Sequence, residues 1–120
     1  MRLAGLTILI AEDDPLIASD LSSILEDEGA NIMGPYRTVA DSLGELGKRE
    51  PSGAILDITL LDGDSFPIAA HLAASAVPFV FYSAVQGRAA RIARATKAPV
   101  LGEAHQSCEA VDVLASLLQC

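Results

Sequence analysis

Short, continuous apolar runs alternate along the chain with longer segments whose apolar residues follow helical spacing. The runs predict five strands, at residues 6–11, 30–35, 54–56, 77–82 and 99–101. The intervening segments predict five helices, at about residues 15–28, 38–50, 66–75, 87–96 and 108–118. Strands that are apolar at nearly every position are typical of a parallel sheet covered on both faces, and the connections have the length of crossover helices.

The expected fold is therefore α/β, a doubly wound five-stranded parallel sheet with helices on both faces. The chain has 120 residues and a mass of 12.5 kDa, so we expect one domain, residues 1–120. In the first helix an apolar stripe should face the sheet, with Gly29 at the C-terminal end. The stripe consists of Leu16, Ile17, Leu21, Ile24 and Leu25. Thr38 should cap the second helix, and Gly34-Pro35 should end the second strand in a turn.

Charge and hydropathy exclude several classes of protein. Sixteen acidic residues against eight basic ones give a net charge of -8, which argues against a nucleic-acid binder that neutralises phosphates. No apolar run approaches the roughly 18 residues of a membrane span, and the N-terminus does not resemble a signal peptide, so we expect a cytoplasmic protein. Cys108 and Cys120 lack metal-type spacing and receive no role.

Polar residues stand at the carboxyl ends of the predicted strands, which meet at one edge of a parallel sheet. They are Glu12, Asp13 and Asp14 after the first strand, Asp57 after the third, Ser83 after the fourth and Glu103 after the fifth. Like charges about 4 Å apart cost about 4 kcal/mol at an effective dielectric constant near 20, and a divalent cation would remove that cost. Because the available ligands are oxygens, with His71 and His105 outside metal-type spacing, the expected ion is Mg²⁺.

Three stretches in register resemble the receiver domains of two-component response regulators. ILIAEDDPLI (8–17) is similar to the family's first strand and acidic pair, and ILDITLLDGDSF (55–66) to its phosphoacceptor segment. FVFYSA (79–84) is similar to the fourth strand, which ends in the hydroxyl residue and small residue of the family's switch. The resemblance implies the flavodoxin-like strand order 2-1-3-4-5.

The same resemblance implies a role for each matching residue. Asp57 would be the phosphoacceptor, taking a phosphoryl group from a phosphohistidine on a sensor histidine kinase or a histidine phosphotransfer protein. Mg²⁺ would be bound by Asp13, Asp57 and the backbone carbonyl of Thr59, with Glu12 acting through water. Ser83 would be the switch hydroxyl that binds the phosphoryl oxygens. The domain would assist its own phosphorylation and dephosphorylation but would not otherwise be an enzyme.

The resemblance fails after the fifth strand. The family normally has a lysine there, followed by proline and an aromatic residue, whereas this chain has Glu103, Ala104 and His105. Val100 stands at the position of the switch aromatic. A phosphoryl group adds about -1.5 to -2 charge, which Glu103 would oppose. Either the metal carries most of the neutralisation or Arg88 substitutes for the lysine, and Arg88 is alternatively an exposed helix residue.

A basic stripe marks a possible partner surface. It consists of Arg88, Arg91, Arg94 and Lys97, which recur every third residue of the predicted helix 87–96. The family commonly docks or dimerises through the face formed by this helix, the strand 99–101 and the last helix. The alternative interpretation is a solvated helix face.

Several other functions remain open. The departures at Glu103, Ala104 and Val100 are compatible with a pseudo-receiver, an interaction module that no longer uses phosphorylation. A haloacid dehalogenase-like phosphatase would need an aspartate where Thr59 stands, and the acidic loop 12–14 would repel a flavin phosphate. The sequence leaves open the kinase, the output, the oligomeric state, the phosphoryl lifetime and whether the domain stands alone or belongs to a longer chain.

Glu103→Lys tests the alignment after the fifth strand. If this side chain faces the pocket, the substitution replaces a repulsive charge with an attractive one, so the phosphorylated form should persist severalfold longer. The decay of radiolabelled phosphoprotein measures this lifetime. An unchanged lifetime would show that residue 103 does not face the phosphoryl group.

Overall fold

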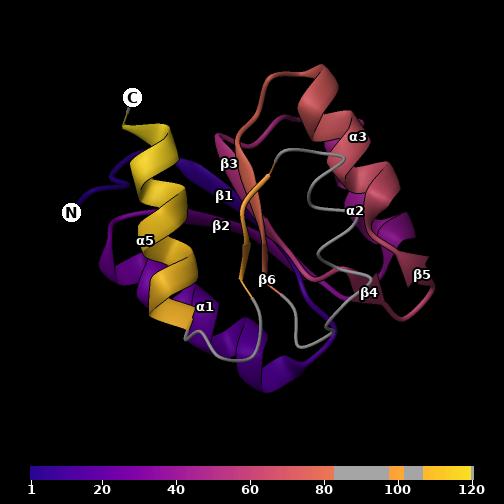
Figure 1. The fold of residues 1–120 in the computed structure, drawn as a ribbon, viewed down its shortest axis with the longest axis horizontal. Helices are drawn as coiled ribbons and strands as arrows, with labels where there is room; N and C mark the ends of the chain where they lie inside the picture. The colour runs from indigo at the N-terminus through magenta and orange to yellow at the C-terminus, as the bar shows by residue number, and fades with distance from the viewer. Residues whose placement is uncertain (83–97, 102–106, 120) are drawn as a thin grey trace.

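The computed structural model describes residues 1–82, 98–101 and 107–119. Its centre is a five-stranded sheet with the order β2-β1-β3-β6-β7, and every neighbouring pair is parallel (Figure 1). The strands are β1 (Thr7–Ala11), β2 (Asn31–Tyr36), β3 (Gly53–Leu56), β6 (Phe79–Tyr82) and β7 (Val100–Leu101). In terms of the five predicted strands this is the order 2-1-3-4-5, so the doubly wound, flavodoxin-like fold is confirmed.

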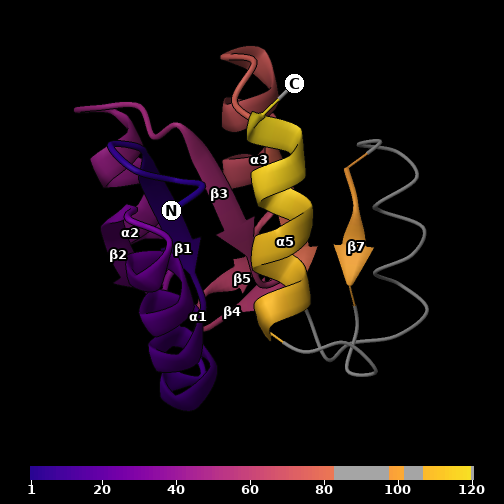
Figure 2. The same ribbon diagram turned by 90° about the vertical axis from the view of Figure 1, so that its left-hand side faces the viewer.

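Helices cover both faces of the sheet. The described helices are α1 (Pro15–Asp27), α2 (Val39–Leu46), α3 (Phe66–Ala74) and α5 (Ser107–Leu118). α1 and α5 pack together on one face, and α2 and α3 lie on the other (Figures 1 and 2). The predicted helix at residues 87–96 lies outside the described residues. None of the helices in the described part of the chain is long and apolar enough to cross a membrane.

The strands divide the core into two layers because successive side chains point to opposite faces. In β1, Ile8 and Ile10 pack in the layer under α1 and α5, whereas Leu9 packs in the layer under α2 and α3. In the latter layer Phe81 meets the rings of Phe79 and Phe66 edge-on, at centroid distances of 5.5 Å and 6.4 Å. Burial on both sides explains why the inner strands β1, β3 and β6 are almost entirely apolar, whereas the edge strand β2 is mostly exposed or half-buried.

The ends of α1 follow the predicted signals, but its apolar stripe is narrower than predicted. Pro15 is the first helical residue, and Gly29 follows the helix with a φ of +88°. Leu21 and Leu25 are buried, whereas Leu16 is 81% exposed, so its assignment to the buried stripe was wrong. Nine residues separate Leu16 from Leu25, about two and a half turns at 3.6 residues per turn, which places Leu16 on the opposite side of the helix.

Two segments differ from their predicted structures. β2 does not end in a turn at Gly34-Pro35 but continues to Tyr36, because an irregularity opposite Leu9 to Ala11 absorbs an extra residue. The Asp- and Gly-rich segment after Asp57, where neither a strand nor a helix was predicted, forms an antiparallel pair, β4 (Thr59–Leu60) with β5 (Gly63–Asp64). Strands of two residues are too short to show an alternating pattern.

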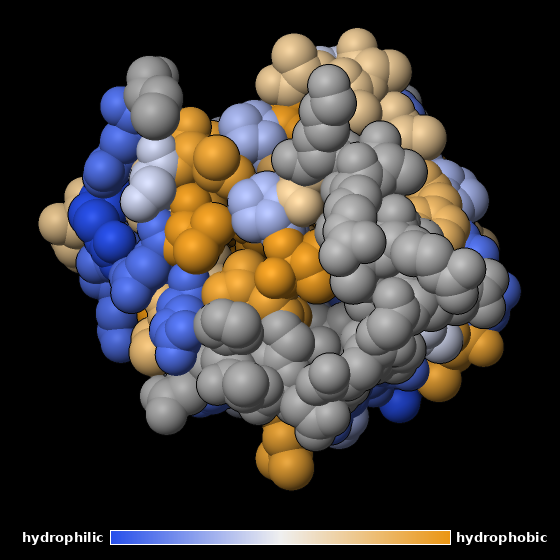
Figure 3. Space-filling view, in the orientation of Figure 1, coloured by the Kyte–Doolittle hydropathy of each residue, from blue (hydrophilic) through white to orange (hydrophobic). Residues whose placement is uncertain are grey.

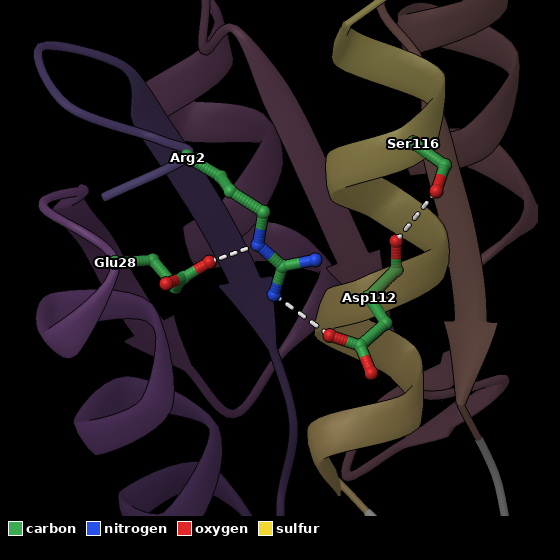
Figure 4. A network of polar contacts seen from close by, with 4 residues as sticks. All are labelled: Arg2, Glu28, Asp112 and Ser116. Carbon is green, nitrogen blue, oxygen red and sulfur yellow. Dashed lines mark hydrogen bonds and ion pairs between the residues drawn. The ribbon is translucent and has the colours of Figure 1, made fainter.

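The N-terminal segment is tied to both helices of one face (Figure 4). The guanidinium of Arg2 donates to the carboxylate of Glu28 at the end of α1, and to Asp112 of α5 at 2.7 Å. The carbonyl of Asp112 also accepts from the hydroxyl of Ser116 at 3.1 Å. Leu3 is buried beneath this network. Exposed ion pairs stabilise only slightly, so the burial of Leu3 contributes most to holding the segment.

Gly34→Ala should destabilise the fold by about 2 kcal/mol or more. Gly34 has a φ of +109°, and an added Cβ would lie 2.8 Å from both the carbonyl oxygen of Ile10 and the amide nitrogen of Tyr36. Gly44→Ala in α2 is the matched control, because a Cβ there meets nothing within 4 Å and alanine favours a helix by about 1 kcal/mol. Chemical denaturation should give opposite signs for the two variants, and equal effects would contradict this account of Gly34.

Candidate metal site

The pairing of β1 with β3 brings two acidic segments together. Ala11 is the partner of Leu56 in the parallel register, so the residues that follow, Glu12 and Asp57, emerge at the same edge of the sheet. The amide of Asp57 donates to the carbonyl of Ala11 at 2.7 Å, which extends the strand pairing up to the site. On the other side, the amide of Glu12 donates to the carbonyl of Tyr36 at 2.9 Å. Backbone hydrogen bonds therefore fix both acidic residues.

Three of the predicted site residues form a compact carboxylate cluster. Oxygen atoms of Glu12, Asp13 and Asp57 all lie within 4.8 Å of one another. Glu12 is only 3% exposed, and the other two are partly buried. Asp14, the third acidic residue of the loop, is instead the N-cap of α1, and its carboxylate accepts from the amide of Leu16 at 2.9 Å.

The surroundings of Glu12 keep its carboxyl group protonated. Loss of hydration on burial, followed by the hydrogen bond with the neighbouring Asp57, raises the pKa of Glu12 to about 9. The amide of Asp14 donates to Oε2 of Glu12 at 3.1 Å and opposes part of this rise. The cluster thus retains a proton at neutral pH mainly because burial disfavours the charged form of Glu12.

The donor set fits a hard divalent cation such as Mg²⁺. All three side chains offer carboxylate oxygens, and one of them is buried at high energetic cost. Thr59, whose carbonyl is a predicted ligand, lies two residues beyond Asp57, and its amide donates to Oδ1 of Asp57 at 3.4 Å. The role of the Thr59 carbonyl remains a prediction. His71 pairs instead with Glu50 at 3.3 Å.

Two residues beside the cluster were missed from the sequence. Nε of Arg37 donates to the carbonyl of Asp13 at 3.3 Å, and the carbonyl of Arg37 accepts from the amide of Leu61 at 3.2 Å. The carboxylate of Asp62 accepts from the amides of Val39 and Ala40 at 2.6 Å and 3.1 Å. These amides begin α2, and the bond from Val39 is the main cause of the lowered pKa of Asp62. Arg37 directly follows β2, so the rule that identified the acidic residues could also have identified it.

The remaining predicted site residues divide into two groups. Val100 lies in β7 opposite Phe81, where it is partly buried against the core layer under α2 and α3. Ser83, Arg88, Glu103 and Ala104 lie outside the described residues.

Comparison with known proteins places the chain in a family. No family model matches it. Among curated proteins it is similar to the phyllosphere-induced regulator PhyR of Methylorubrum extorquens, with 39% identity over 84 residues. That match covers 68% of this chain and 32% of PhyR, so the chain spans about a third of the length of this relative.

Solved structures agree with this relationship. SdrG from Sphingomonas melonis Fr1 is 32% identical with a TM-score of 0.75, over 100% of this chain and 99% of that one. The receiver domain of the PhyR response regulator of Erythrobacter litoralis has a TM-score of 0.81 over 99% of this chain and 93% of that one, and at 22% identity supports the fold alone. The protein belongs to the response regulator receiver domains.

Glu12→Gln should make the stability of the metal-free protein less dependent on pH. Between about pH 4.5, the ordinary pKa, and about 9, the folded state retains a proton that the unfolded state has released. The free energy of unfolding of the wild type should therefore fall as pH rises through this range, by up to about 1.4 kcal/mol per pH unit. The amide variant lacks this group and should show a shallower slope in urea denaturation with a chelator present.

The exposed Glu26 of α1 provides the control, since Glu26→Gln should leave the slope unchanged. Adding Mg²⁺ should stabilise the wild type most at high pH, where the cluster is most nearly ionised. Equal slopes for wild type and Glu12→Gln would show that Glu12 ionises normally in the folded protein.

Proposed function

We propose that this receiver domain is a phosphoacceptor of a two-component or phosphorelay pathway, that it accepts the phosphoryl group on Asp57, and that it signals through protein contacts. The observation that carries the proposal is the cluster of Glu12, Asp13 and Asp57 at the carboxyl edge of the sheet. A purely structural cluster would be expected to include basic side chains that pair with its carboxylates. This cluster instead holds closely spaced carboxylates around Asp57, which is partly exposed.

The chemistry requires position and charge compensation more than strong nucleophilicity. An oxygen of Asp57 attacks the phosphorus of a phosphohistidine, the P–O bond forms, and the P–N bond breaks with its electron pair returning to the imidazole. The amide of Thr59 orients Oδ1 of Asp57, and the amide of Asp57 anchors the residue to β1. Bound Mg²⁺ would supply the positive charge that lets a dianionic phosphoryl group approach three carboxylates.

Asp13, Asp57 and the carbonyl of Thr59 would hold the ion, with Glu12 acting through water. The depth of Glu12 supports its indirect role, because a nearly inaccessible carboxyl group is better placed to orient a water or a neighbouring ligand than to reach an exposed ion. Ser83 would act as the switch hydroxyl, as the family resemblance implies. The domain would work in the cytoplasm and would catalyse only its own phosphorylation and dephosphorylation.

Partners would be a sensor histidine kinase or a histidine phosphotransfer protein, and a protein that recognises the phosphorylated state. For the latter, the surface around β7 and α5 is the candidate. Figure 3 shows apolar colour gathered beside α5, over the end of the sheet. Leu117 of α5 is exposed, Val113 of α5 and Val100 of β7 are partly exposed, and so is Tyr82 at the end of the neighbouring β6. Such side chains suit a protein contact or a dimer.

A phosphorylation-independent interaction module is the second candidate. It is favoured by Val100, which packs beside Phe81 where the family has its switch aromatic. A partly buried valine has no ring to move between an inward and an outward position. In this alternative the acidic cluster would bind a cation or have no role in signalling. The partner surface would be available whether or not Asp57 is phosphorylated.

Asp57→Asn should abolish phosphorylation while leaving the fold intact. Incubation of the wild type with acetyl phosphate and Mg²⁺ should add one phosphoryl group, which intact-mass spectrometry detects, and the variant should gain none. Asp64→Asn is the matched control, since Asp64 is exposed in the same segment and its carboxylate accepts from the amide of Phe66 at 3.2 Å. It should be labelled like the wild type.

Labelling of Asp57→Asn to the wild-type extent would exclude Asp57 as the acceptor. A wild type that binds Mg²⁺ but neither gains a phosphoryl group nor binds beryllofluoride would favour the phosphorylation-independent module. Beryllofluoride is included because it mimics the phosphoryl group without hydrolysing and so separates failed phosphorylation from rapid dephosphorylation.

A further inference from the structure

Arg37 contacts both of the segments that form the carboxylate cluster. Its Nε donates to the carbonyl of Asp13, in the loop after β1, at 3.3 Å. Its own carbonyl accepts from the amide of Leu61, in the β4–β5 segment after Asp57, at 3.2 Å. The residue thus bridges the two loops from the end of the neighbouring strand β2.

Among the described cations, Arg37 alone lies at this edge of the sheet. The four are Arg2, Arg37, Lys48 and Arg49. Arg2 is engaged by Glu28 and Asp112 on the face of α1 and α5. Lys48 and Arg49 follow the far end of α2 and precede Ser52, whose amide donates to the carbonyl of Thr7 at the start of β1. They therefore lie near the opposite edge of the sheet.

We propose that Arg37 sets the charge balance of the acidic site, weakening the binding of a cation and strengthening the binding of a phosphoryl group. The phosphoryl half of this inference rests on the proposed function. The cation half does not, because it follows from the position of the guanidinium beside Asp13. Nothing in the family resemblance assigned a role to this position, and the substitute cation considered from sequence was Arg88.

The cation half and the phosphoryl half of the proposal predict opposite effects of Arg37 on the two binding affinities. A positive charge near the cluster repels Mg²⁺ and attracts a dianion, and because the guanidinium is exposed both effects are partly screened by salt. A residue that only held the loops in place would behave differently. Its loss would misplace Asp13 and the segment after Asp57, and both the metal and the phosphoryl group would bind less tightly.

Arg37→Met and Arg37→Lys separate charge from hydrogen bonding. Methionine retains much of the apolar stem and loses the charge, whereas lysine retains the charge and loses the planar donor that reaches the carbonyl of Asp13. Arg49→Met is the matched control, because it removes one exposed positive charge from the other edge of the sheet. Thermal unfolding of each variant identifies any general loss of structure.

The experiment measures two affinities of the full chain at low ionic strength. Amide chemical shifts during a MgCl₂ titration give the affinity for the metal, and a beryllofluoride titration at saturating Mg²⁺ gives the affinity for the phosphoryl mimic. We expect Arg37→Met to bind Mg²⁺ about two- to fivefold more tightly and beryllofluoride at least about threefold more weakly. Arg37→Lys should stay closer to the wild type in both, and moderate salt should reduce the Mg²⁺ difference.

Weaker binding of both ligands by Arg37→Met, or effects no larger than those of Arg49→Met, would overturn the inference. A wild type that fails to bind beryllofluoride or to be labelled on Asp57 would overturn the proposed function instead, and with it the phosphoryl half. In that case the cation half would still be tested by Mg²⁺ alone. Tighter Mg²⁺ binding by Arg37→Met would support an effect of the Arg37 charge on the cation site, and an unchanged Mg²⁺ affinity would overturn that effect.

Discussion

The parallel register of β1 against β3 is the constraint on which the site depends. Ala11 lies beside Leu56, and both strands are buried on both faces, so a slip of one residue would exchange the side chains between the two core layers. The hydrophobic core therefore decides where Glu12 and Asp57 emerge. Apolar residues several positions away thus hold Glu12 beside Asp57, where burial and the hydrogen bond with Asp57 raise the pKa of Glu12.

This arrangement costs stability, which surrounding backbone hydrogen bonds offset in part. The amides of Glu12 and Asp57 donate to the carbonyls of Tyr36 and Ala11, and the guanidinium of Arg37 donates to the carbonyl of Asp13. Asp62 adds two bonds that fasten the segment after Asp57 to the first turn of α2. A domain of this size has only about 5–15 kcal/mol of net stability, so repulsion of a few kcal/mol is a large fraction of it.

Sequence reasoning succeeded where the signal was local or periodic and failed where it depended on contacts between distant segments. The five strands of the main sheet, the Thr38 cap and the Gly29 helix end all followed from residue type and spacing. The β4–β5 pair was too short to show a period. Leu16 was assigned to the buried stripe although the helical period places it opposite Leu25, so its exposure could have been predicted from the sequence. Arg37 directly follows β2 and could have been identified by the rule used for the acidic residues. Asp62 acts on the start of α2, more than 20 positions away, and residue type alone does not reveal such a partner.

The charge pattern ties these observations together. Where the family resemblance leads one to expect a lysine, the sequence has Glu103, and the chain as a whole carries a net charge of -8. Phosphorylation would add about -1.5 to -2 more at an edge that already holds three carboxylates. Under the proposed function, such a site depends more strongly on its bound cation than one with a pocket lysine would. Arg37, which is hydrogen-bonded to both acidic loops through its guanidinium and its backbone carbonyl, is then important because a single positive charge is a large part of the compensation that the described residues can offer.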